Sequence, residues 1–115
     1  MLEHVDLHEN NFMGPLPTKF PLSLVTVDLS CNKISGAIPP GLSSLVALTI
    51  LDLHDNRLSG DITLSLSKLT SLKVLNISNN SLNGQIPLGI GYAFENLRAF
   101  DLSSNQLEGP IHVTF

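Results

Sequence analysis

The segment LTILDLHDNRLSGDIT, residues 48–63, is the stretch of the chain that decides its fold. Four other segments align with it without a gap: LEHVDLHENNFMGPLP from Leu2, LVTVDLSCNKISGAIP from Leu24, LKVLNISNNSLNGQIP from Leu72 and LRAFDLSSNQLEGPIH from Leu97. Self-similarity at a period of about 20–50 residues is the signature of a repeat architecture. The sequence therefore predicts one array of five repeats, at approximately 2–23, 24–47, 48–71, 72–96 and 97–115.

The first half of each repeat alternates apolar and polar residues, as in Leu51-Asp52-Leu53. An alternation of period two indicates a short β-strand with one buried face. The inward pairs are then Val5/Leu7, Val27/Leu29, Leu51/Leu53, Leu75/Ile77 and Phe100/Leu102. Strands this short are not stable alone, so we expect them to stack in parallel, one from each repeat.

An asparagine follows each predicted strand, and it recurs every 22 to 25 residues. The column consists of Asn10, Asn32, Asn56, Asn80 and Asn105. The chain must turn inward at this point, where its backbone groups would otherwise be buried without partners. An asparagine amide supplies two donors and an acceptor, so we predict a structural ladder in which it satisfies the turn and bonds the neighbouring coil.

The second half of each repeat has apolar residues at every third position, as at Leu42, Leu45 and Leu48. That period predicts a 3₁₀ or irregular helical limb. A glycine four residues after the ladder asparagine suits a tight bend, and the proline at 17, 39 or 87 favours an extended path. Together these patterns predict an α/β solenoid, with a short parallel sheet on the concave face and irregular or 3₁₀ segments on the convex face.

Composition excludes several classes of protein and site. Lys+Arg total 6 against 10 Asp+Glu, a net charge of −4, so a nucleic-acid partner is not expected. The single cysteine, Cys31, excludes an internal disulfide and a cysteine-based zinc cage. No apolar run reaches the about 20 residues needed to cross a bilayer, so we expect no membrane span in this chain, and no cofactor.

The repeats resemble the leucine-rich repeat family, whose general pattern is L-x-x-L-x-L-x-x-N-x-L. The continuation x-G-x-I-P, present as Ser35-Gly36-Ala37-Ile38-Pro39 and Asn83-Gly84-Gln85-Ile86-Pro87, is similar to the plant extracellular subclass. The resemblance implies a right-handed superhelix. It also implies kinship with receptor-like proteins, receptor-like kinases and secreted inhibitors of cell-wall-degrading enzymes, hence the apoplast or the extracellular face of the plasma membrane.

The candidate ligand-binding residues are those that point outward from the predicted concave sheet. They are His4, Asp6, His8, Thr26, Asp28, Ser30, Ile50, Asp52, His54, Val74, Asn76, Ser78, Asp101 and Ser103. The aspartates in this set could bind a cation or the basic residues of a ligand, although aspartate is also ordinary repeat sequence, hydrogen-bonded along the sheet.

Two chemical readings of these side chains are not favoured. Ser30, His54 and Ser78 lie on successive repeats beside Asp52 and contain the parts of a hydrolase triad. An open sheet provides neither an oxyanion site nor a pocket that excludes water, so we predict no enzyme. His8 and His54 lie two repeats apart, so we predict no metal shared between them. Cys31 is interpreted as a small, half-buried filler, with a free thiol as the alternative.

Asn76 and Asn79 each begin an Asn-x-Ser sequon, which makes them candidate glycosylation sites. The first repeat starts at once on its strand and the fifth stops soon after its glycine, without the cysteine-bearing caps of the family. We therefore expect adjoining repeats or caps in a longer native chain.

The leading functional hypothesis is a protein or peptide recognition module. It would be a segment of a plant receptor-like protein or kinase ectodomain that binds a ligand or co-receptor through its concave face, in defence or development. The alternatives are a secreted inhibitor of a cell-wall-degrading enzyme and a non-functional gene fragment.

Overall fold

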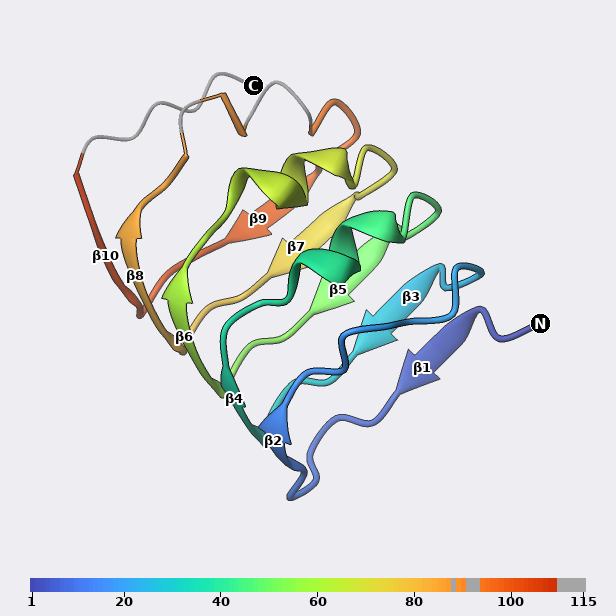
Figure 1. Cartoon of the computed structure of the whole chain (residues 1–115), viewed down its shortest axis with the longest axis horizontal. Helices are drawn as coiled ribbons and strands as arrows, with labels where there is room; N and C mark the ends of the chain where they lie inside the picture. Colours follow the sequence, from blue (N-terminus) through green and yellow to red (C-terminus); the bar gives the residue numbers. More distant parts are fainter. Residues whose placement is uncertain (88, 91–93, 110–115) are drawn as a thin grey trace.

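The five repeats fold into five coils that stack in chain order (Figure 1). The structure is a computed structural model and describes residues 1–87, 89–90 and 94–109. The last six residues of the predicted fifth repeat, and residues 88 and 91–93 of the fourth, lie outside the described residues. Within the described part, each coil contributes a strand to each of two parallel sheets, which confirms the predicted solenoid.

The first sheet is the one that the alternating pattern predicts. Its strands are β1 (His4–Asp6), β3 (Thr26–Asp28), β5 (Ile50–Asp52), β7 (Val74–Asn76) and β9 (Ala99–Asp101), in that order. All pair in parallel with no register shift, so the central residues Val5, Val27, Leu51, Leu75 and Phe100 form one inward-facing row. This is the concave sheet.

The extended segments after the ladder asparagines pair as a second parallel sheet, which the sequence reading did not predict. Its strands are β2 (Met13–Pro15), β4 (Lys33–Gly36), β6 (Arg57–Asp61), β8 (Ser81–Gln85) and β10 (Gln106–Glu108). Asparagine and glycine are depleted in strands, and Ser81–Gln85 contains both and no β-branched or aromatic residue, so this segment gives no strand signal by propensity. The pairing follows from the stacking of whole coils.

Two return limbs form the 3₁₀ helices that the three-residue period predicts. They are η1 (Pro40–Ser44) and η2 (Leu64–Lys68), and they lie against each other across neighbouring coils (Figure 1). Each buries its third residue, Leu42 in η1 and Leu66 in η2. The described helices do not combine the length and apolar character that crossing a bilayer requires.

A column of leucines fills the space between the two sheets and the return limbs. The middle coils bury their side chains completely, for example Leu45, Leu48, Leu69 and Leu72, each 0% exposed. In the first coil Leu7 is 43% exposed, since no described coil covers that side. The core therefore continues through the stack from one coil to the next, and it positions the concave sheet as one rigid surface.

Candidate recognition surface

The structure brings the predicted outward-facing residues together on the concave sheet. Thr26 pairs with His4 on one side and Ile50 on the other, and Val74 continues the same row. Two positions later, Asp52 lies between Asp28 and Asn76, in a row that runs from Asp6 to Asp101. The sheet thus presents its polar side chains in straight rows, one residue from each coil.

Each acidic or amide residue in the second row accepts hydrogen bonds from the residue two positions later in its own coil. The Oδ1 atom of Asp28 accepts from the backbone N–H of Ser30 at 3.0 Å and from its hydroxyl at 2.6 Å. The pairs Asp6/His8, Asp52/His54, Asn76/Ser78 and Asp101/Ser103 repeat the arrangement. These bonds run within a coil and not along the sheet, which corrects the sequence-based interpretation. They hold the outward side chains in fixed positions.

The two histidines of the third row each make a hydrogen bond through Nδ1 to the aspartate of their own coil. His54 Nδ1 lies 2.5 Å from Asp52 Oδ1, and this hydrogen bond raises the pKa of His54, with burial acting in the opposite direction. The equivalent bond to Asp6 raises the pKa of His8. The hydroxyl and backbone N–H of Ser103 lower the pKa of Asp101.

The serines that the triad reading invoked are bonded elsewhere. The hydroxyl of Ser30 donates to Asp28 and that of Ser78 donates to Asn76, each within its own coil. His54 donates to Asp52, but neither serine hydroxyl is its partner in this arrangement. The surface therefore offers fixed donors and acceptors to a ligand, without an assembled nucleophile and base.

The ladder asparagines lie beneath the edge of the concave sheet and bond two coils at once. Asn32 Nδ2 donates to the carbonyl oxygens of Leu7, one coil earlier, at 3.0 Å and of Leu29 in its own coil at 3.1 Å. Its Oδ1 accepts from the backbone N–H of Phe12, also one coil earlier, at 3.1 Å. Asn56, Asn80 and Asn105 repeat the pattern, so each turn is closed by the coil that follows it.

The two sequon asparagines have different surroundings. Asn76 is half-buried in β7, and its Oδ1 atom accepts from Ser78, the hydroxyl residue of the same sequon, at 2.7 Å. Asn79 is exposed on the turn after β7, and its amide donates to Asp55 Oδ1. An oligosaccharide is more easily accommodated at Asn79, which projects from the edge of the sheet.

Sequence reasoning missed a column of residues with positive φ, one position before each ladder asparagine. Glu9, Cys31, Asp55, Asn79 and Ser104 have φ between 53° and 57°. Aspartate and asparagine tolerate this left-handed conformation better than other residues, so Asp55 and Asn79 were the available signal. As a result Cys31, in the turn after β3, lies against His54 and Asp55 of the next coil.

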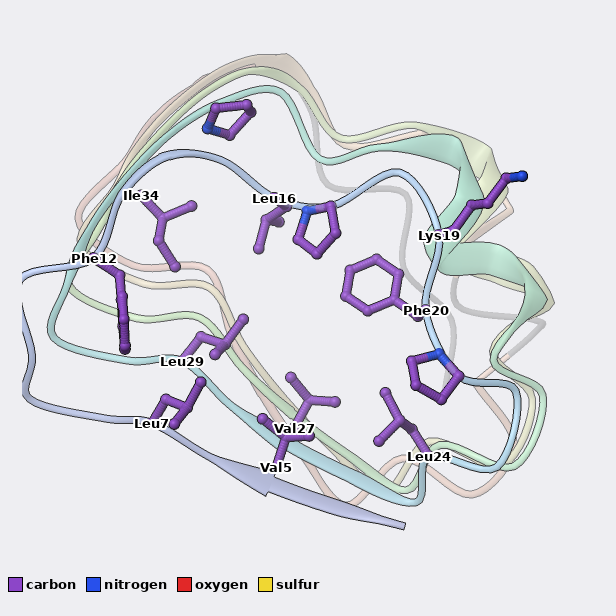
Figure 2. Close-up of a pocket in the computed structure, with 13 residues that line it drawn as sticks. Val5, Leu7, Phe12, Leu16, Lys19, Phe20, Leu24, Val27, Leu29 and Ile34 are labelled. Carbon is purple, nitrogen blue, oxygen red and sulfur yellow. The ribbon is translucent and has the colours of Figure 1, made fainter. Parts of the chain in front are cut away.

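An apolar cavity of about 300 Å³ lies within the first two coils, away from the concave surface (Figure 2). Val5, Leu16, Phe20 and Val27 point into it from the first two coils. Lys19 is the only charged residue of its lining and extends away from the cavity. The cavity is thus an apolar part of the coil interior and has no polar groups to orient a ligand.

The rows of outward side chains, the asparagine ladder and the two parallel sheets define a solenoid repeat protein. Comparison of sequences identifies its family. A family model described as leucine rich repeat matches residues 48–107, and a second leucine rich repeat model matches residues 1–21 and 23–45. The chain belongs to the leucine-rich repeat family. A search of curated proteins found no match.

Solved structures of plant receptor ectodomains have the same fold. The chain is 34% identical to the Arabidopsis receptor kinase HAESA, solved in complex with the peptide hormone IDA and the co-receptor SERK1, with a TM-score of 0.92 over 96% of this chain. It is 40% identical to the ectodomain of SOBIR1 from Arabidopsis thaliana, with a TM-score of 0.85 over 95% of this chain. For a TDR receptor the identity is 38% and the TM-score 0.89 over 92%.

The chain spans only part of these proteins. It covers 19% of the HAESA chain, 18% of the TDR receptor chain and 61% of the SOBIR1 chain.

Proposed function

We propose that this chain is a recognition segment of a plant receptor-like protein or receptor-like kinase ectodomain, acting outside the cell. Its concave sheet binds a peptide or a protein, and a co-receptor is a further candidate partner. Defence or developmental signalling is the proposed setting. The observation that carries the proposal is the face itself, where each coil holds an outward acidic or amide side chain in a fixed hydrogen bond.

The spacing of the coils suits an extended peptide that crosses the strands. Parallel strands lie about 4.8 Å apart, so five coils span about 20 Å, and an extended peptide of about six residues covers that distance. Such a peptide would cross the row of Thr26, Ile50 and Val74, with every second side chain directed toward the sheet. The outward side chains are already held by hydrogen bonds within their own coils, so binding a peptide costs less side-chain conformational entropy.

Charge favours a ligand with basic residues. The row beginning at Asp6 contains four carboxylates and one amide, and the chain has a net charge of −4. Acidic groups arranged on one face favour encounter with positively charged partners and oppose binding of acidic ones. Among the similar structures, HAESA is solved with the peptide hormone IDA and PEPR1 with AtPEP1, which supports a peptide as the ligand class.

The test is selection of binders from a random dodecapeptide library with equal numbers of acidic and basic peptides. We expect the peptides enriched on this chain to contain lysine or arginine. Ile50→Arg places a positive charge at an apolar side chain of the concave face that is 38% exposed, and because the ligand is expected to be basic, we expect this change to reduce the affinity of the enriched peptides at least about tenfold.

Val46→Arg is the matched control, since it makes the same kind of change at a residue that is 60% exposed outside the concave sheet. The affinity of this variant for the enriched peptides should equal that of the unchanged protein. Enriched peptides that bind Ile50→Arg as well as the unchanged protein, or that are lost only with Val46→Arg, would place recognition elsewhere and contradict the proposal.

A further inference from the structure

Three side chains with different metal-binding atoms meet where the turn after β3 lies against the turn after β5. Cys31 Sγ is 3.8 Å from His54 Nε2 and 3.6 Å from Asp55 Oδ2, and the latter two atoms are 3.9 Å apart. The three atoms form a nearly equilateral triangle. Cys31 and Asp55 lie in the turns beyond the strands, whereas His54 also belongs to the outward residues of the concave face.

The size of the triangle fits a tetrahedral zinc ion. Zinc lies about 2.3 Å from a thiolate sulfur, and about 2.0–2.2 Å from an imidazole nitrogen or a carboxylate oxygen. Tetrahedral angles then place the ligand atoms about 3.4–3.6 Å from one another. The distances among Cys31, His54 and Asp55 exceed this range only slightly, so a small contraction of the side chains would complete the coordination.

The neighbours of the triangle already orient two of its members. A carboxylate only accepts hydrogen bonds, so the 2.5 Å contact with Asp52 requires the proton of His54 to be on Nδ1. In the neutral ring the lone pair is then on Nε2, the atom that faces Cys31. A carboxylate behind a metal-binding histidine is the usual outer partner in zinc sites. Asn79 holds Asp55 through Oδ1, which leaves Oδ2 on the side of the triangle.

We propose that Cys31, His54 and Asp55 form a binding site for one Zn²⁺ ion, with a water molecule as the fourth ligand. The thiol proton passes to solvent when the sulfur–zinc bond forms, and the thiolate and carboxylate together balance the charge of the ion. A thiolate with an imidazole selects zinc over magnesium or calcium, which prefer oxygen ligands. The ion would join the second coil to the third. The zinc proposal does not rest on the proposed peptide recognition, although His54 belongs to both sets of residues.

A second cluster of possible metal ligands consists of Asp6, His8 and Asp28, but its geometry does not suit a metal ion. Its histidine approaches both carboxylates through Nδ1, at 2.5 Å from Asp6 and 4.0 Å from Asp28. The short contact requires the proton on that same nitrogen, which is therefore not available to a metal, and the group has no thiol. We expect no zinc binding there, and His8 provides a matched control for His54.

The experiment is a titration of the whole, untagged chain with Co²⁺, which takes the place of zinc and reports its ligands by absorption. We expect one ion per chain and a thiolate-to-cobalt charge-transfer band, which zinc displaces. Cys31→Ser should abolish the band. His54→Asn and Asp55→Asn should each weaken zinc binding about 100-fold in competition with a chelating dye, and Asp52→Asn about tenfold. His8→Asn should keep the original zinc affinity.

Two further readouts guard against variants that do not fold. Circular dichroism shows whether each variant retains the structure. In the unchanged protein, zinc should slow alkylation of Cys31 by iodoacetamide at least about tenfold, because a metal-bound thiolate is protected. Cobalt binding without a thiolate band, equal affinity in His54→Asn, or alkylation that zinc does not slow would each overturn the proposal.

Discussion

The ladder asparagines differ in how much of their hydrogen bonding crosses between coils. Asn56 Nδ2 donates to Leu29 O of the preceding coil at 2.9 Å, and its Oδ1 accepts from Ile34 N of that coil at 3.0 Å. Asn10 has the same place in the repeat, but it is exposed and donates only to Leu7 and His8 of its own coil. A comparison of Asn56 with Asn10 therefore isolates the effect of the hydrogen bonds between coils, because both residues are asparagines at the same position of the repeat.

Asn56→Ala is expected to lower the free energy of unfolding by about 3 kcal/mol, since partly buried backbone groups left without partners cost about 1–3 kcal/mol each. Asn10→Ala should cost less than about 1 kcal/mol, because water replaces its bonds. Urea unfolding followed by circular dichroism measures both. Equal losses in the two variants would show that the bonds between coils are not what the asparagine contributes.

The exposed His8–Asp6 pair gives the concave face a defined response to pH. The hydrogen bond to Asp6 raises the pKa of His8 above its ordinary value of 6.5, and Asp28 and Glu9 act in the same direction. The same bond lowers the pKa of Asp6 below 3.8. The His8 contribution to stability is complete below pH 6.5 and is lost as pH rises through the folded pKa. The Asp6 contribution is complete above pH 3.8 and is lost as pH falls.

We expect Asp6→Asn to return the pKa of His8 toward 6.5, because the amide removes the negative charge that favours the imidazolium. A titration of the His8 ring signals by NMR measures this change. Glu3→Gln, which alters a carboxylate near His4, is the control and should leave the His8 titration as it is. An unchanged His8 pKa in Asp6→Asn would exclude the pair as the cause.

At the scale of elements, helix η1 lies close against the first coil at Gly41. A Cβ atom on this residue would lie 2.1 Å from the backbone oxygen of Thr18, far inside contact distance. Ser65 has the same second position in η2 and accommodates a side chain there. The return limb of the first repeat is shorter than those of the second and third, which accounts for the close approach of Thr18.

Gly41→Ala is expected to destabilise the fold by about 2 kcal/mol, because the backbone of one coil must move. Ser65→Ala loses one hydroxyl contact, with Thr63, and should cost less than about 1 kcal/mol. Thermal unfolding of the two variants side by side measures the difference. If the Gly41→Ala protein is as stable as the original, the backbone near Thr18 can move away from η1 at little cost, and the contact does not constrain the fold.

The sequence predicted the elements whose pattern is set by burial. Alternation around Leu51 predicts β5, and leucines at every third position predict η2, because both patterns reflect which side chains face the core. The second sheet was not predictable in this way. Its strand β8, with the sequence SLNGQ, contains no β-branched or aromatic residue and includes asparagine and glycine, which disfavour strands, so its pairing arises from the stacking of coils.

For the whole molecule, the burial of the concave sheet predicts a gradient of local stability. The central residues of β3, β5 and β7, which are Val27, Leu51 and Leu75, are 1–2% exposed. Val5 in β1 and Phe100 in β9 are only partly buried. In a solenoid the stability of each coil depends on contacts with its neighbours, so middle coils open least often.

We expect backbone amides of β3, β5 and β7 to exchange with deuterium most slowly, and those of β1 and β9 at least about tenfold faster. Hydrogen exchange followed by mass spectrometry or NMR measures this. Uniform protection over all five coils would indicate that the array opens as a single unit. Slowest exchange in β1 or β9 would contradict the proposed dependence on neighbouring coils.

The candidate sites were predictable to different degrees. The outward rows follow from alternation within one repeat, so Asp52 and Thr26 could be placed on the concave face from the sequence. The contact of Cys31 with His54 could not, because it depends on the register between coils and on a positive φ at Cys31. Neither leaves a motif within a single repeat.

The direction of the asparagine ladder has a consequence for synthesis on the ribosome. The backbone N–H of Leu58, in the third coil, finds its acceptor in Asn80 of the fourth, and that of Leu82 in Asn105 of the fifth. The coil made last therefore lacks several acceptors that only the next coil supplies, and Leu58 N–H finds its acceptor 22 residues later. We therefore expect the growing end of a nascent array to keep unpaired backbone N–H groups until the following repeat has left the ribosome.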